Sequence, residues 1–419
     1  MKPLPDAVLV SWIESNFSRE RDFLAALVKI PTDNPPGDCA AHAALTRDLL
    51  MEMGLTVEEH PVPRAEVHAA GMRSVTNLIV RHRFAGEGPC IALNAHGDVV
   101  PPGEGWTQDP YGATVLDDPQ HGPTMYGRGV AVSKSDFATY AFALRALEQL
   151  AANGHGLKGS IELHLTYDEE TGGNIGPGWL LAHGLTRPDY ALCAGFSYAV
   201  TSAHNGCLHL EVVVRGRQAH AATPDSGADA LAAATAILQE LYDSRRDLQA
   251  HRSSIPGIGH PTLNVGLIEG GINTNVVPDR VAFRLDRRII PEESVAAAES
   301  SLRSLIEHAA ARQPGIRVEI RRILLAQPLT RLPGAERLIL PLQHHGERFF
   351  GVPILEHGVP LYTDARHYAG AGIPTVVYGA GPRTLGEANG HAADECLRLN
   401  DLQRATCTVA CMLAELLAA

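Results

Sequence analysis

Histidine and carboxylate side chains follow three apolar segments of the chain, at the point where each segment ends. His96 ends the segment IALNAH, and Asp98 comes two residues later. Glu169 and Glu170 follow IELHLTYD, and His391 lies in the loop after TVVYGAG. Imidazole and carboxylate groups bind divalent transition metals, and an adjacent pair of glutamates can be divided between a metal ligand and a general base. We therefore predict a catalytic metal site built from these three loops.

Each of these signals has a simpler explanation when it is taken alone. His96 and Asp98 fit a loop histidine with a capping aspartate, and Glu169 and Glu170 fit a solvated acidic loop. Three apolar strands that each deliver His or Glu just past their ends are much rarer by chance than any one of them. Ligand sites of α/β sheets gather at the carboxyl ends of strands, so the combination favours a site.

Strands and helices alternate in the first half of the chain. This pattern indicates a mixed or parallel sheet that is covered by helices on both faces. The spacing of apolar residues and the stop signals predict helices over 11–30, 39–53 and 136–152, and strands over 76–80, 90–95, 161–166 and 190–193.

From about residue 206 the order of elements changes to βαββαβ, with helices over 229–248 and 294–312. That order is typical of a small ferredoxin-like α+β sandwich. After about residue 325 the first rhythm returns, with a strand at 375–378. We therefore predict an α/β catalytic domain in two pieces, residues 1–205 and 325–419, with an inserted domain over 206–324.

Composition argues against several classes of protein. The formal charge of −12 argues against a nucleic-acid role, because such a role needs a basic face. No apolar stretch reaches the roughly 18 residues that a membrane span needs, and we see no signal peptide. The seven cysteines are scattered, odd in number and without CxxC spacing, as in a reduced chain. We expect a cytoplasmic protein that binds neither nucleic acid nor membranes.

Nine short motifs carry a resemblance over nearly the whole chain. They are AHGDVVP, GWTQDPYGA, YGRG, DEETGG, GRQAHAATP, NVVPDR, TDAR, GIPTV and GHAADE. The chain resembles the aminoacylase and carboxypeptidase G family of metallohydrolases, which includes acetylornithine deacetylase and succinyl-diaminopimelate desuccinylase. The resemblance implies a catalytic α/β domain and an inserted lid domain that dimerises, hence a homodimer or a higher homo-oligomer.

The resemblance also implies a role for each residue of the predicted metal site. His96 and His391 match metal ligands, and Glu170 matches the ligand beside the general base, Glu169. Asp98 matches the carboxylate that orients the first histidine.

Three lid residues match functional positions of the family as well. His220 matches the lid histidine that reaches across the dimer to the developing oxyanion, although it could simply end a lid strand. Asn275 and Arg288 match positions that commonly hold a carboxylate of the substrate.

Two of the five metal-binding side chains of the family are missing. Val132 stands where an Asp usually bridges two zinc ions, and Gly195 stands at a Glu or Asp ligand position. Two divalent ions about 3.5 Å apart repel by roughly 19 kcal/mol at an effective dielectric near 20, and the bridging carboxylate normally screens them. We therefore expect one divalent transition metal per chain (Mn, Zn or Co).

His96, Glu170 and His391 remain to hold that ion. In the family His96 serves one ion and the other two residues serve the second, so a single ion has to lie between the subsites. Asp136 is four residues after Val132, on the same face of a predicted helix, and could reach the metal directly or through water. The alternative is a helix-start residue favoured by the helix dipole.

Three functions stay open at this point. The first is hydrolysis of the amide bond in N-acyl amino acids or small dipeptides, the family default. The second is release of ammonia from an amino-substituted aromatic carboxylate, for which one metal suffices because an electron-poor ring holds the developing charge. The family includes an aminohydrolase that converts 5-nitroanthranilate to 5-nitrosalicylate, and we expect this chain to resemble it. The third is a non-catalytic binding protein, which retention of Glu169 and Glu170 disfavours.

Overall fold

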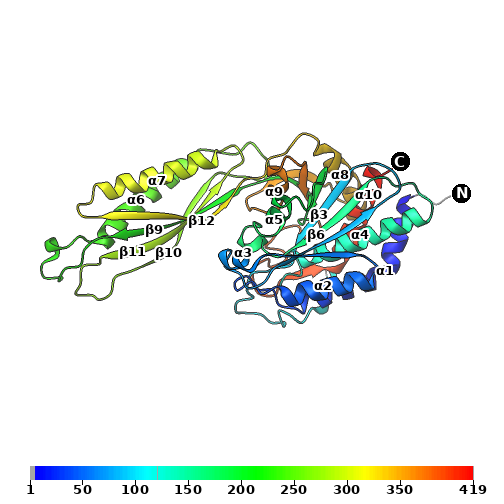
Figure 1. Ribbon diagram of the computed structural model, residues 1–419, viewed down its shortest axis with the longest axis horizontal. Helices are drawn as coiled ribbons and strands as arrows, with labels where there is room; N and C mark the ends of the chain where they lie inside the picture. The colour runs from blue at the N-terminus through cyan, green and yellow to red at the C-terminus, as the bar shows by residue number, and fades with distance from the viewer. Residues whose placement is uncertain (1–4, 120, 419) are drawn as a thin grey trace. The chain divides into compact units, whose positions relative to one another are not determined.

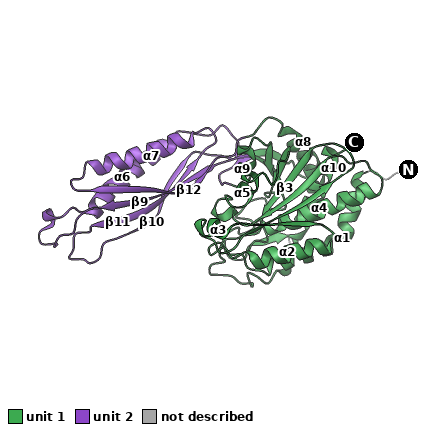
Figure 2. Ribbon diagram, in the orientation of Figure 1, with its two compact units in different colours: residues 1–202, 331–357, 363–419 green, residues 203–330, 358–362 purple. Residues whose placement is uncertain are grey.

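The computed structural model describes residues 5–119 and 121–418 and divides the chain into two compact units (Figure 2). Unit 1 comprises residues 1–202, 331–357 and 363–419, and unit 2 comprises residues 203–330 and 358–362. Unit 2 is thus inserted in the chain of unit 1, and the segment 358–362 belongs to it as well.

An eight-stranded mixed sheet forms the centre of unit 1 (Figure 1). β6, β3, β7 and β14 run parallel to one another, whereas β1 with β2, β2 with β6 and β14 with β8 form antiparallel pairs. His96, the last residue of β3, is paired with Thr166, the last residue of β6, so the carboxyl ends of these two strands lie together. The strands, in sheet order, are β1 (Val57–Pro61), β2 (Thr76–Arg83), β6 (Ser160–Thr166), β3 (Cys90–His96), β7 (Tyr190–Cys193), β14 (Thr375–Val377), β8 (Ala199–His204) and β13 (Leu355–Val359).

Helices flank this sheet, which confirms the predicted α/β class. α4, with α1 and α10 beside it, packs on β3 and β6, and α9 packs on β7 and β14. A second sheet of three strands has the order β15-β5-β4. The remaining elements of unit 1 are α1 (Pro5–Val28), α2 (Ala40–Glu52), α3 (Arg64–Ala69), β4 (Thr114–Asp118), β5 (Gly122–Tyr126), α4 (Lys134–Ala152), the 3₁₀ turn η1 (Glu169–Thr171), α5 (Pro177–Ala182), α8 (Glu336–Phe350), α9 (Ala365–Gly370), β15 (Cys396–Arg398) and α10 (Leu399–Leu416).

Unit 2 has the βαββαβ order predicted from the sequence. Its antiparallel sheet has the order β10-β11-β9-β12, which is that of a ferredoxin-like sandwich. The Asp229 carboxylate accepts backbone N–H bonds from Leu231 and Ala232 and so caps α6. The elements are β9 (Gly206–Arg215), the 3₁₀ turn η2 (Pro224–Ser226), α6 (Ala230–Leu248), β10 (Thr262–Gly270), β11 (Arg280–Ile289), α7 (Val295–Ala311) and β12 (Arg317–Ala326).

Some elements differ from the predictions. β8 was not predicted, because its residues AVTSAH are small or polar, although all six are buried. α1 begins at Pro5, before the predicted start at residue 11. None of the helices among the described residues is long and apolar enough to cross a membrane.

Candidate metal centre

The first predicted ligand, His96, is buried at the carboxyl end of β3. Its Nδ1 lies 2.9 Å from the backbone oxygen of Asp98 and 3.4 Å from the carboxylate of the same residue. An acceptor at Nδ1 fixes the ring tautomer and leaves Nε2 as the atom that can bind a metal. Nε2 faces Glu169, whose Oε2 is 3.9 Å away.

The Asp98 carboxylate also anchors the turn that carries the two glutamates. It accepts the backbone N–H of Glu169 and that of Glu170, both at 3.2 Å. The side-chain amide of Asn34 donates a third hydrogen bond at 2.9 Å. Asp98 is completely buried, so one carboxylate holds both His96 and the glutamate turn in place.

Glu170 and His391 form a second pair, with 3.4 Å between Oε1 and Nε2. The hydrogen bond with Glu170 raises the pKa of His391, and burial opposes it. Among the described residues, His96, Glu170 and His391 do not form one group whose ligand atoms all lie within 4.8 Å of one another. His96 therefore pairs with the predicted base Glu169, and the predicted ligands Glu170 and His391 pair with each other, so a single shared position for the metal stays a prediction.

The charges around these pairs fit a cation. Burial raises the pKa of Glu169 well above its usual range, His96 lowers it, and Glu170 raises it further. Burial likewise raises the pKa of Asp364 to about 7, while His96 lowers it. Buried carboxylates with so little positive charge between them are stabilised by a metal ion.

Asp364 is a residue of this site to which the sequence analysis assigned no role. It lies in the quoted motif TDAR, it is buried, and its Oδ2 has no hydrogen-bond partner among the described residues. Gly173 lets it approach, since a Cβ there would lie 2.0 Å from Oδ1 of Asp364. The TDAR motif is the sequence signal that could have pointed to Asp364.

The structure places no carboxylate at either of the two missing ligand positions. Val132 is half-buried, and its N–H donates to Glu395 at 3.3 Å. Gly195 is packed so closely that an added Cβ would lie 2.1 Å from Cγ1 of Val377. The site therefore keeps its histidines and glutamates without the bridging carboxylate.

Asp136 is buried in the first turn of α4. Its Oδ1 accepts the N–H of Ala380 at 2.6 Å, and its Oδ2 has no hydrogen-bond partner among the described residues. Burial raises the pKa of Asp136 to about 7, whereas the N–H of Ala380, the charge of His96 and the N–H of Gly195 lower it. Its direct binding of the metal stays a prediction.

A buried ion pair joins the two loops around the centre. Arg128 of the YGRG motif contacts Glu395 at 2.6 Å, and Glu395 also accepts the N–H of Ala131 at 3.0 Å. Arg128 donates further to the backbone oxygen of Ala392, next to His391. The pair was not predicted, and it couples the turn at Val132 to the loop of His391.

Unit 2 brings two of the three predicted lid residues together. His220 is exposed, and the N–H of the next residue, Ala221, donates to the backbone oxygen of Asn275 at 3.0 Å. Asn275 lies just before β11 begins at Arg280, whereas Arg288 lies near the last residue of that strand, where it contacts Asp286 at 3.0 Å. Within unit 2, then, Arg288 is separate from His220 and Asn275.

Comparison with known proteins decides the family. The model of peptidase family M20/M25/M40 matches residues 92–415. The chain belongs to this family. It is therefore a metallohydrolase that acts on C–N bonds, as predicted from its motifs.

Two relatives of this M20 chain are acetylornithine deacetylases. The one from Myxococcus xanthus is 29% identical over 350 residues, which cover 81% of this chain and 84% of the relative. The one from Erwinia tasmaniensis is 28% identical over 267 residues, and the match spans 63% of this chain and 64% of the relative.

A solved structure confirms the fold of this M20 chain. The YXEP protein of Bacillus subtilis, described as a dinuclear metal-binding peptidase of the M20 family, superposes with a TM-score of 0.67. It is 17% identical, and the match covers 96% of this chain and 98% of that one.

Proposed function

We propose that this M20 chain releases ammonia from a small aromatic carboxylate that bears an amino group, with one metal per chain. Conversion of 5-nitroanthranilate to 5-nitrosalicylate is the specific candidate. The observation that supports the proposal is the pair Val132 and Gly195 at ligand positions, beside a retained Glu169. In the overall reaction, the oxygen of water adds to the ring carbon that bears the amino group, the C–N bond breaks, and ammonia leaves.

A divalent ion held by His96, Glu170 and His391, with Asp136 as a further candidate ligand, would supply an activated water and a Lewis acid. The Glu169 carboxylate faces His96 and takes the proton of the attacking water, which it then gives to the leaving nitrogen. Asp98 fixes the backbone of Glu169, so the base keeps its position.

An electron-poor ring makes a second ion unnecessary. When water adds to a ring with a strongly electron-withdrawing substituent, the negative charge spreads over the ring and that substituent. An amide has no such reservoir, and the tetrahedral oxyanion must be stabilised by groups of the enzyme.

Hydrolysis of N-acyl amino acids or small dipeptides is the second candidate, and the named deacetylase relatives favour it. One metal can suffice here too, since His₂Glu zinc sites cleave amides. Metal-loaded enzyme should be tested on amino-substituted aromatic carboxylates and on N-acyl amino acids, with Glu169→Gln as the control. Ammonia release from the aromatic carboxylates, without deacylation of the N-acyl amino acids, supports the proposal. Rapid deacylation of the N-acyl amino acids, without ammonia from the aromatic carboxylates, favours this second candidate instead.

We also propose a homodimer, or a higher homo-oligomer, through unit 2. β10 is an edge strand of its sheet, and the exposed apolar side chains Leu267 and Ile268 lie on it, 61% and 55% exposed. Apolar residues on an open strand edge favour pairing with another chain. Sedimentation of the wild type and of Ile268→Asp tests this, since a dimer should be lost in the variant.

A further inference from the structure

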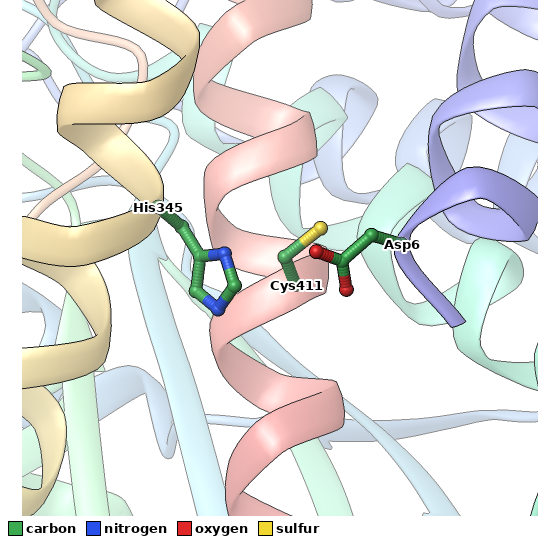
Figure 3. Close-up of side chains that lie close together, drawn as sticks. All are labelled: Asp6, His345 and Cys411. Carbon is green, nitrogen blue, oxygen red and sulfur yellow. The ribbon is translucent and has the colours of Figure 1, made fainter. Parts of the chain in front are cut away.

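A cysteine, a histidine and an aspartate meet on three helices of unit 1 (Figure 3). Asp6 belongs to α1, His345 to α8 and Cys411 to α10. One ligand atom from each residue lies within 4.8 Å of the other two. In Figure 3 the Cys411 side chain lies between the imidazole of His345 and the carboxylate of Asp6.

His345 is the residue of this group that points to a ligand. It is 5% exposed, and its Nε2 lies 3.0 Å from Oε2 of Glu415. Its Nδ1 is buried and has no hydrogen-bond partner among the described residues. A carboxylate on one ring nitrogen, with the other nitrogen left open, is the arrangement of metal-binding histidines. An unpaired buried nitrogen costs stability unless a ligand meets it.

A cavity of about 430 Å³ adjoins the group and has room for an ion and water. Asp6, His345, Cys411 and Glu415 line it, together with His155, whose Nε2 is also buried and without a partner among the described residues. A water bound to the ion can meet such a nitrogen. The cavity therefore offers both ligands and a polar neighbour.

This cavity is remote from the catalytic centre. Leu157 lines it just before β6 begins, whereas Glu169 follows the other end of β6. The seven residues of β6 span roughly 20 Å at about 3.3 Å each. An ion here cannot share ligands with the ion of the catalytic centre.

We propose that Asp6, His345 and Cys411 bind a divalent transition metal such as Zn²⁺, with water as the fourth ligand. Sulfur, nitrogen and oxygen in a tetrahedron suit zinc, whose ligand atoms lie about 2.0–2.3 Å from the ion. Small side-chain shifts bring the three atoms to those distances. The ion ties α1, near the start of the chain, to α8 and α10.

Binding of the ion requires a change at two of the ligands, Cys411 and Asp6. The Cys411 thiol, whose pKa is raised by burial, loses its proton to solvent and coordinates as the thiolate. Asp6 forms an ion pair with Arg348, which is 47% exposed at its side chain and can turn to water as Asp6 binds the ion.

Cobalt(II) tests the proposal on the full chain, since a cobalt–thiolate bond gives a charge-transfer band in the near ultraviolet. We expect the band in the wild type and its loss in Cys411→Ser. The matched control is Cys407→Ser, one turn earlier on α10 and also buried, which should keep the band. Glu170→Gln should keep it too, because no cysteine is among the predicted catalytic ligands.

Zn²⁺ should also raise the Tm of Cys407→Ser by more than it raises that of Cys411→Ser, because the latter variant keeps only the catalytic site. His345→Gln, checked for folding by circular dichroism, should lose the band. Absence of a thiolate band in the wild type at saturating cobalt overturns the proposal. A band of undiminished intensity in Cys411→Ser overturns it as well.

Discussion

Oδ1 of Asp136 accepts the backbone N–H of Ala380 at 2.6 Å, and the backbone N–H of Gly195 helps to lower the pKa of the same carboxyl. Asp136 follows Val132 by four residues, and Gly195 affects its pKa. Val132 and Gly195 are the two positions at which this chain lacks a metal ligand. The charge of His96 acts on it as well. We therefore predict that Asp136 compensates for the missing ligands.

Asp136→Asn tests this role. The amide oxygen can still accept the N–H of Ala380, so we expect little change in Tm and a weaker affinity for the metal, because a charged ligand is lost. Metal titration and thermal unfolding measure the two effects. An unchanged metal affinity with a lowered Tm would assign Asp136 a purely structural role.

Glu169→Gln should lower kcat by at least roughly 10²-fold, because the amide cannot shuttle the proton. Metal content and substrate affinity should stay near those of the wild type, since Glu170 is the predicted ligand of the pair. Equilibrium binding of substrate and metal analysis of the variant check both statements. Near-normal turnover would show that another group acts as the base.

The catalytic centre should hold one ion per chain. Metal analysis is best done on active Cys411→Ser, which removes the separate site on α1, α8 and α10. One ion per chain at full activity is the expected result, because Val132 and Gly195 offer no side-chain ligand. Two tightly bound ions, both needed for turnover, would contradict it.

Arg128→Met should destabilise the fold by about 3–5 kcal/mol, because it leaves the buried Glu395 without its partner. The double variant Arg128→Met with Glu395→Gln removes the stranded charge and should recover part of that loss. Urea unfolding of both variants gives the two free energies. Equal losses in both would mean that packing, not charge, sets the cost.

Glu20 should make the stability depend on pH. It is fully buried on α1, and burial raises its pKa from 4.5 to about 8, opposed by the hydroxyl of Thr406. The folded chain therefore holds this proton more tightly than the unfolded chain. The resulting stabilisation is complete below about pH 4.5 and is lost as the pH rises to about 8, at up to about 1.4 kcal/mol per pH unit.

Glu20→Gln does not titrate and should flatten the free energy of unfolding over that interval. Urea unfolding at several pH values measures it, with Glu14→Gln on the exposed side of α1 as the control. If the pH profile of Glu20→Gln matches that of the wild type, Glu20 is not protonated in the folded chain.

The sequence predicted those parts of the site that local patterns determine. β3 and β6 are apolar runs that are easily recognised as strands. Since His96, Asp98 and the Glu169–Glu170 pair lie at or just after the ends of these strands, they could be placed on one edge of the sheet. The Arg128–Glu395 pair and the position of Asp364 depend on loops that meet only after folding. No periodicity in the chain announces such contacts, and β8 was missed because its burial comes from its neighbours rather than from apolar side chains.

The packing at Gly195 limits how the missing ligand could be restored. Any side chain there would overlap Cγ1 of Val377, on the neighbouring strand β14. A substitution that restored a carboxylate at 195 would first meet this overlap, so a second change at Val377 would be needed to make room. An engineered return of the ligand at 195 therefore requires two linked substitutions, and the first of them alone should destabilise the fold.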